Sequence, residues 1–193
     1  MSEVRTIEGI ELPAPGEWAL DAAHTTVGFT ARHLMVTKVR GRFEDFTGTV
    51  HVTEDPLASW VEVEISTPSI VTGSEQRDQH LKSPDFLDVE TFPAMTFRST
   101  KLEPTGGRSF RLHGDLTIRD VTEPVVLEGE FLGLVGDPWG GTRAGFTAST
   151  EIDRERWGMT WNVAMETGGL LVSKKVQLEL EVQLVPAAAS QAA

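Results

Sequence analysis

The sequence predicts an all-β protein in which eight or nine antiparallel strands close into a barrel with a short helical insert. Three observations lead to this prediction. Apolar and polar residues alternate with a period of two in segment after segment, as they do on half-buried strands. The alternation slips by one residue near Glu44-Asp45, as it does where a strand bends. One interval, residues 72–88, breaks the alternation and has helix-capping signals instead.

The phase slip lies in residues 39–52, after two shorter strands expected at residues 18–20 and 25–32. Its apolar and small residues occupy odd positions first and even positions later: Val39, Gly41 and Phe43, then Phe46, Gly48, Val50 and Val52. One regular strand cannot bury both sets on the same side, so a bulge or bend is expected between them. Bent strands of this kind help a sheet to curl closed.

The helical insert follows a strand at residues 61–65. Thr72 and Glu75 have the spacing of a capping box, with Thr72 at the N-cap and Glu75 at N3, so a helix is expected over residues 76–82. Ser83-Pro84 ends this helix and is expected to cap a further turn. Three apolar residues would dock the insert on the barrel: Leu81, Phe86 and Leu87.

Alternation returns after the insert, which predicts strands at residues 95–102, 110–118, 124–135, 144–152 and 176–184. In the last of these, valines and leucines occupy every second position between glutamines and glutamates. A helix would spread these residues around its circumference, whereas a strand gathers them on one face. We expect one domain over residues 17–185, with an N-terminal tail at residues 1–16 and a C-terminal tail at residues 186–193.

Composition narrows the possible partners. The 193-residue chain has 29 acidic and 17 basic residues and a net charge of −12, which disfavours nucleic acid as a partner. It has no cysteine, which excludes disulfides and thiolate chemistry. No stretch approaches the ~18 apolar residues of a membrane-spanning helix. Residues 1–16 contain no apolar run of signal-peptide length, so we expect a cytoplasmic protein.

The predicted inner face mixes large and small residues. Gly41, Gly48, Gly114, Ala144 and Ala148 are in phase with large apolar residues that include Phe43, Phe97, Leu116 and Phe146. An eight-stranded barrel either fills with its own side chains or holds one small ligand. The small residues could therefore leave room for a tunnel or could make space for large neighbours, and the sequence leaves both readings open.

A set of motifs runs through the predicted domain in a fixed order. They are Trp18-Ala-Leu-Asp21-Ala-Ala-His24-Thr25, Val27-Gly-Phe29, Arg32-His33-Leu34-Met35, Val39-Arg-Gly41-Arg-Phe43, Arg77-Asp78-Gln-His80-Leu81, Ser83-Pro-Asp-Phe86-Leu-Asp88, Phe92-Pro93-Ala-Met95-Thr-Phe97-Arg-Ser99, Gly114-Asp-Leu116-Thr117-Ile118 and Val121-Thr122-Glu-Pro124-Val125. In this order they resemble the YceI-like family. The resemblance implies an extended, lipocalin-like, eight-stranded antiparallel β-barrel with a helical insert. It also implies an elongated tunnel that binds polyisoprenoid chains or other long amphiphiles, and a homodimer. Many members of the family are periplasmic, whereas we expect this protein to be cytoplasmic.

These inferences predict a binding or carrier protein that holds a long apolar ligand without turnover. The residues expected to line the tunnel are Val27, Phe29, Phe43, Val63, Ile65, Met95, Phe97, Leu116, Ile118 and Phe146. Because such ligands carry a polar head, polar residues of the resembling motifs are candidates for the tunnel mouth: His24, His33, Arg77 and His80. Alternatively, Arg77 and His80 tie the insert to strand ends through backbone carbonyls. Trp157 and Trp161 could floor a pocket or plug one end of the barrel.

Catalytic and metal sites have little support in the sequence. His24 and His33 are separated by an odd number of residues, so on one regular strand they would point to opposite faces. No HExxH, nucleophile-elbow, P-loop or dinucleotide motif occurs. Asp78 and His80 would diverge on a helix, and Asp78 is expected to face Lys82 instead. We therefore expect no metal and no cofactor. An enzyme that acts on an isoprenoid or lipid through His24 or His80, and a structural module with a filled barrel, remain the alternatives.

Overall fold

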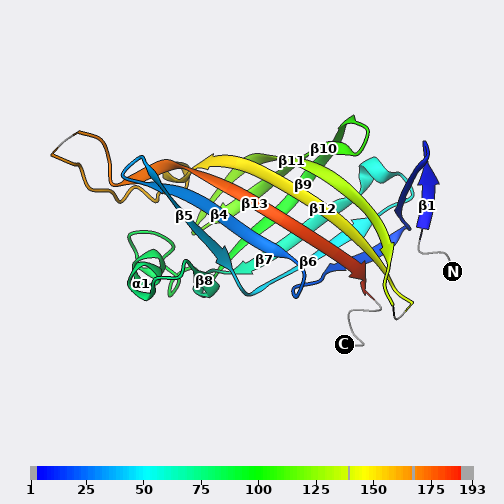
Figure 1. Ribbon diagram of the computed structural model, residues 1–193, viewed down its shortest axis with the longest axis horizontal. Helices are drawn as coiled ribbons and strands as arrows, with labels where there is room; N and C mark the ends of the chain where they lie inside the picture. The colour runs from blue at the N-terminus through cyan, green and yellow to red at the C-terminus, as the bar shows by residue number, and fades with distance from the viewer. Residues whose placement is uncertain (1–3, 139, 167, 188–193) are drawn as a thin grey trace.

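The computed structural model describes residues 4–138, 140–166 and 168–187 and is built mainly of long antiparallel strands (Figure 1). The strands are β1 Val4–Ile7, β2 Ile10–Pro13, β3 Gly16–Leu20, β4 Thr26–His33, β5 Thr37–Phe43, β6 Phe46–Val52, β7 Trp60–Ser66, β8 Ile70–Val71, β9 Ala94–Gly106, β10 Ser109–Ile118, β11 Val121–Gly136, β12 Thr142–Asp153 and β13 Val172–Pro186. The helical elements are α1 Glu75–Lys82 and the 3-10 turns η1 Pro56–Ala58, η2 Thr67–Ser69 and η3 Arg154–Trp157.

Eight strands form a closed ring. Hydrogen-bonded neighbours follow the order β12-β11-β10-β9-β7-β6-β3-β13, and β13 pairs with β12 to close it. All of these pairings are antiparallel. The all-β class, the antiparallel eight-stranded barrel and the helical insert are thereby confirmed. Closure pairs both edges of the sheet and encloses one apolar face.

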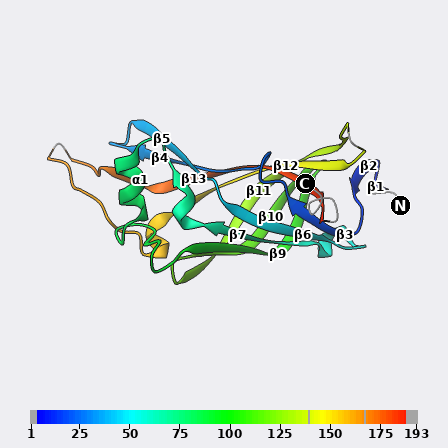
Figure 2. The ribbon, with the colours of Figure 1, turned by 90° about the horizontal axis from the view of Figure 1, so that it is seen from below.

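The strand β13 is long enough to have two partners on one side. Its residues 172–181 pair with β4, whereas Leu184, Val185 and Pro186 pair with β3. The strands β4, β5 and β8 therefore form a lateral extension of the ring toward the end at which α1 lies (Figures 1 and 2). This extension lengthens the barrel along its axis.

The expected bend at Glu44-Asp45 is where the chain passes from this extension into the ring. The strand β5 ends at Phe43 and pairs with β4, whereas β6 begins at Phe46 and pairs with β3 and β7. The backbone N–H of Glu44 donates to the Ser69 carbonyl oxygen at 3.2 Å. Both Phe43 and Phe46 are buried. The two-residue break thus resolves the slip in the alternation.

The helix α1 has a different N-cap from the one that the sequence predicts. Ser74 is the N-cap, and its hydroxyl accepts from the Arg77 N–H. The capping-box assignment to Thr72 was wrong because the Thr72 backbone N–H donates to Oδ1 of Asp78 at 2.9 Å, and its hydroxyl donates to the same oxygen. This arrangement also turns Asp78 away from the expected pair with Lys82. Asp78 lies six residues after Thr72, beyond the three-residue span of a capping box, so the capping motif does not reveal that the Asp78 carboxylate binds Thr72.

The segment after α1 packs the insert onto the barrel. Ser83 is the C-cap of α1, with its N–H donating to the His80 carbonyl oxygen at 3.1 Å. It also begins the further turn that the sequence predicts, since its hydroxyl accepts from the Asp85 N–H at 3.3 Å and its carbonyl oxygen accepts from the Phe86 N–H at 3.0 Å. Phe86 and Leu87 are buried and Leu81 is half-buried, as the docking role requires.

The residues expected to form an N-terminal tail contain the hairpin β1–β2. Its turn is Glu8-Gly9, and both residues have positive φ, of 51° and 79°. Ile10 and Leu12 pack against a small cluster of buried residues: Trp18, Phe131, Ala144 and Leu184. Nη1 of Arg5 donates to the Glu54 carbonyl oxygen at 2.8 Å. At the other terminus β13 runs to Pro186, and residues 188–193 of the expected C-terminal tail lie outside the described residues.

In the described part of the chain, no helix is long and apolar enough to cross a membrane.

Candidate ligand-binding cavity

An elongated cavity of about 800 Å³ occupies the interior of the barrel. Its volume lies within the roughly 300–1,000 Å³ range of small-molecule sites. All ten residues predicted to line a tunnel do line this cavity: Val27, Phe29, Phe43, Val63, Ile65, Met95, Phe97, Leu116, Ile118 and Phe146. That they hold a ligand stays a prediction.

Strand register arranges these side chains in layers. Ile65 on β7 lies opposite Met95 on β9, and Val63 lies opposite Phe97. Phe97 in turn lies opposite Leu116 on β10. Because neighbours in register point to the same side of a sheet, each layer continues around the wall and keeps the lining apolar.

The inward glycines make room for large neighbours and do not by themselves make the cavity. A Cβ on Gly41 would lie 2.3 Å from Cζ of Phe29, and one on Gly48 would lie 2.2 Å from Cδ1 of Leu20. At Gly41 and Gly48, the small residue therefore makes space for a large neighbour, which is one of the two roles that the sequence left open. The open space remains in addition to it, between side chains that point inward from opposite walls.

The cavity has a mouth at one end and is closed at the other. The hairpin β1–β2 lies at one end of the barrel (Figures 1 and 2), and Nη1 of Arg5 joins it to the Glu54 carbonyl oxygen before η1. At this end the lining includes exposed residues of three connections: Glu8 between β1 and β2, Leu57 in η1 and Arg108 between β9 and β10. At the end where α1 lies, the lining residues are buried or half-buried: Leu81, Phe86, Leu87, Arg154, Met159 and Val172. A chain-like ligand would therefore enter past the β1–β2 hairpin.

Arg154 is a charged residue in the closed end of this otherwise apolar cavity. Only 3% of it is exposed. Its Nε donates to the Ser173 carbonyl oxygen at 3.0 Å, its Nη1 donates to the Met159 carbonyl oxygen, and its guanidinium lies 5.7 Å from the Phe86 ring centroid. Its Nη2 is buried and has no hydrogen-bond partner among the described residues.

The charge of Arg154 is not neutralised by an ion pair within the described residues. Desolvation lowers the pKa of Arg154, and the negative charges of Glu155 and Asp153 offset part of this effect. Both carboxylates are engaged elsewhere, since Glu155 pairs with Lys174 at 2.8 Å and Asp153 caps η3. Because an arginine stays protonated in proteins, the closed end of the cavity carries a buried cation.

Sequence reasoning missed Arg154, although a signal for it exists. The inward residues of β12 occupy even positions, from Ala144 to Ile152, and Arg154 is the next residue in the same phase. An arginine that continues the apolar face of a strand is a candidate for a buried polar contact. The charged run Asp153 to Arg156 hides this signal.

The four predicted head-group residues do not line the cavity. His24 is exposed and pairs with Asp21 at 2.8 Å, and His33 is exposed at the end of β4. Arg77 donates to the hydroxyl and the carbonyl oxygen of Thr72, which is the alternative role expected for it. His80 pairs with the Asp85 carboxylate at 2.8 Å, not with a backbone carbonyl. His24, Arg77 and His80 bind partners within five residues of themselves. These motif residues therefore stabilise their own loops and the insert.

The two tryptophans near the closed end have different positions. Trp157 is fully buried, and its indole N–H donates to the Leu116 carbonyl oxygen at 3.0 Å, so it plugs the end of the barrel. Trp161 is half-buried and packs on His80 and Phe86, with ring centroids 4.4 and 5.5 Å away.

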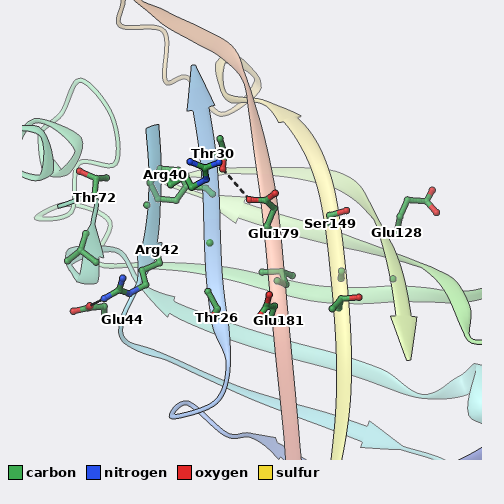
Figure 3. Close-up of a pocket in the computed structure, with 18 of the residues that line it drawn as sticks. Thr26, Thr30, Arg40, Arg42, Glu44, Thr72, Glu128, Ser149, Glu179 and Glu181 are labelled. Carbon is green, nitrogen blue, oxygen red and sulfur yellow. Dashed lines mark hydrogen bonds and ion pairs between the residues drawn. The ribbon is translucent and has the colours of Figure 1, made fainter. Parts of the chain in front are cut away.

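A second hollow, on the outer face of β5, β4, β13, β12 and β11, has a different character (Figure 3). Its lining includes many hydroxyl and charged side chains, among them Thr30, which donates to Glu179 at 3.1 Å. It includes several glutamates: Glu44, Glu128, Glu130, Glu179 and Glu181. Among the described residues no group of three or more His, Cys, Asp or Glu side chains could hold a metal ion. The apolar interior is therefore the stronger candidate site.

A closed antiparallel barrel around an apolar cavity defines a binding barrel, the class of protein that encloses a small ligand inside a single sheet. The family model described as the YceI-like domain matches residues 18–184, and the chain belongs to this family. The chain is 38% identical to Protein YceI of Salmonella newport over 164 residues, which cover 84% of this chain and 82% of that protein.

Solved structures show the same fold. The YceI protein of Campylobacter jejuni matches with a TM-score of 0.69 and 30% identity, over 86% of this chain and 95% of that one. A polyisoprenoid binding domain from Saccharophagus degradans matches with a TM-score of 0.66 and 13% identity, over 88% of this chain and 98% of that one.

Proposed function

We propose that this protein binds a long apolar chain, a polyisoprenoid or a similar lipid, inside the barrel and carries or sequesters it without turnover. The observation that carries the proposal is the continuous apolar cavity of about 800 Å³, which opens at one end. The polyisoprenoid binding domain of Saccharophagus degradans, which shares the fold at 13% identity, supports the choice of ligand class.

The energetics of such a site favour chains. Each buried methylene contributes about 0.8 kcal/mol, so affinity grows with the length of chain that the cavity encloses. One methylene changes the affinity by a factor of about ten or less, so selection by length is loose. We expect several chain-like lipids to bind and short ones to bind weakly.

The geometry favours this function over the two alternatives. An enzyme acting through His24 or His80 would need one of them beside the ligand, and neither lines the cavity. A structural module with a filled barrel would have no interior space of this size.

Organic extraction of the purified protein followed by mass spectrometry tests the proposal. We expect a long-chain lipid to be recovered, or an empty protein to take up added polyprenyl lipid and return it chemically unchanged. A protein that is empty and ignores added polyprenyl lipids would contradict the proposal. Conversion of the added lipid would contradict the absence of turnover.

A matched pair of variants on β12 locates the bound chain. Ala148 lines the cavity as well as the outer hollow, whereas its neighbour Thr147 lines the outer hollow and not the cavity. Ala148→Trp fills the interior and should abolish lipid binding, while Thr147→Trp on the outer face should leave it within about twofold. Far-ultraviolet circular dichroism establishes that both variants fold. Equal binding by the two folded variants would place the ligand outside the barrel.

The homodimer and the cytoplasmic location expected from the sequence stay predictions. Light scattering coupled to size exclusion measures the mass in solution, for which we expect twice that of the 21.1 kDa chain. Fractionation of the source cells, followed by immunodetection, tests the location.

A further inference from the structure

The closed end of the cavity contains a donor that the fold does not use. Arg154 is 97% buried, since 3% of it is exposed, and it lines the cavity with its Nη2 free of protein partners among the described residues. Leaving a buried charged donor unpaired is unfavourable. The other two donor nitrogens of the side chain are fixed by the Ser173 and Met159 carbonyl oxygens, so the guanidinium is held in one orientation.

The surroundings of Arg154 favour a negatively charged partner. Its fixed partners are neutral carbonyls and the face of Phe86, and the two nearest carboxylates are bound to other groups. A guanidinium forms its strongest hydrogen bonds with carboxylate and phosphate oxygens. An uncharged acceptor would satisfy the free donor and leave the charge of the closed end uncompensated.

We propose that Arg154 binds the anionic head of a single-chain lipid, a carboxylate or a terminal phosphate, at the closed end of the barrel. The chain then runs from Arg154 along the apolar lining toward the mouth beside β1. The ligand therefore lies with its head inside and its far end outermost. This inference rests on the proposed function and adds to it the charge of the ligand and the direction in which it lies.

Paired ligands test the charge. A long-chain fatty acid is compared with the alcohol of the same chain, and a polyprenyl phosphate with the corresponding polyprenol, by titration against the purified protein. We expect the anionic member of at least one pair to bind ten times more tightly or better than its alcohol. Preference within the first pair identifies a carboxylate as the head, and preference within the second pair identifies a phosphate.

Two arginines of η3 provide a matched pair of variants. Arg156 is exposed and pairs with Glu123 outside the cavity, so Arg156→Met should keep the preference. Arg154→Met should lose it while still binding the alcohol, and Arg154→Lys should retain part of it. A preference that persists in folded Arg154→Met would overturn the assignment to Arg154.

Spin-labelled fatty acids test the direction on the unaltered protein, so this arm remains if Arg154→Met does not fold. A nitroxide near the carboxylate should broaden the backbone amide signals of Met159 and Val172 at the closed end. A nitroxide near the methyl end should broaden those of Leu57 and Gly107 at the mouth. The reverse pattern would overturn the inference.

The outcomes separate the two proposals. If no member of either pair binds, the proposed function fails and Arg154 has no ligand. If acids and alcohols bind equally, the barrel binds chains and only the inference about Arg154 is overturned.

Discussion

The ring of Phe97 on β9 lies over Gly114 on β10, in the space that a side chain at Gly114 would need. A Cβ on Gly114 would be 2.4 Å from Cε2 and Cζ of Phe97 and 2.7 Å from the carbonyl oxygen of Arg98. The ring could rotate away from such a side chain, but the backbone oxygen could not. The absence of a side chain at Gly114 thus gives the ring of Phe97, which lines the cavity, the space that it occupies.

Gly114→Ala should therefore destabilise the protein by about 1–3 kcal/mol, the usual cost of overpacking. The displaced Phe97 should also reduce the space for a ligand and weaken chain binding. Urea unfolding and lipid titration measure the two effects. The control is Gly145→Ala, whose Cβ would have its nearest neighbour, Cβ of Leu132, at 3.4 Å. Equal stabilities of the two variants would show that Phe97 and the Arg98 backbone move to accommodate a methyl group at Gly114 without loss of stability.

The turn between β4 and β5 should be open to stabilisation. Its central residues Leu34 and Met35 have φ of 53° and 61°, a conformation that costs a residue with a bulky side chain about 1–2 kcal/mol. The Val36 N–H donates to the His33 carbonyl oxygen across this turn at 3.1 Å. Replacing Leu34-Met35 by Asn-Gly, the preferred pair for such a turn, should raise the melting temperature by several degrees.

The control for the turn is Val36→Gly, because Val36 has no positive φ. This substitution adds backbone freedom to the unfolded chain and should destabilise the protein by up to about 1 kcal/mol. An increase in melting temperature with Val36→Gly as large as with Asn-Gly would contradict the explanation by turn geometry.

Asp21 should make stability depend on pH below about pH 4. Burial raises the pKa of Asp21, but hydrogen bonds from His24, Arg143 and the Ala23 N–H lower it more, so the net pKa is below its ordinary value. A carboxyl whose pKa is lower in the folded state stabilises that state above its unfolded pKa of about 3.9, and this stabilisation is lost as pH falls through the folded pKa.

Asp21→Asn should therefore cost about 1–3 kcal/mol at pH 7, and the difference from the wild type should shrink as the pH falls below about 4. Unfolding by urea at a series of pH values measures it. Glu64→Gln is the control, since Glu64 is exposed and its side chain forms neither a hydrogen bond nor an ion pair with the described residues. A gap between Asp21→Asn and the wild type that stays constant down to pH 2 would contradict a lowered pKa of Asp21 in the folded state.

The β1–β2 hairpin should control how fast a bound chain leaves. Ile10 and Leu12 hold it against the cluster around Trp18, and both line the cavity. Replacing both by Asp should detach the hairpin and accelerate release of a fluorescent lipid at least severalfold in stopped-flow displacement. Glu11→Ala, between them on the exposed face, should leave the release rate unchanged. Unchanged release from the double variant would show that the chain leaves by another path.

The sequence was sufficient to predict the barrel and its lining because both depend on a period of two. Once a strand is recognised, alternation alone decides that Val63, Phe97 and Leu116 face inward, whatever their partners are. The bend at Glu44-Asp45 could be predicted for the same reason.

Only part of the polar site could be predicted in this way, because the phase of β12 indicates that Arg154 faces inward but does not show what its side chain contacts. His24 and His80 belong to motifs that resemble a family, but their partners Asp21 and Asp85 lie within five residues and hold local turns. Arg154 contacts Ser173, which is 19 residues away on β13, and such a contact depends on closure of the ring. The N-terminal hairpin was missed because its strands are four residues long each, too short for alternation to be distinctive.

The hairpin also lies outside the segment that the family shares. The family match begins at residue 18, whereas β1 and β2 end at Pro13, so part of the mouth is encoded by residues that precede the common domain. Two members of the family could thus have the same interior and admit different molecules. Transplanting residues 4–15 onto a relative would transfer this part of the entrance, and the effect on lipid uptake could then be measured separately from the effect on affinity.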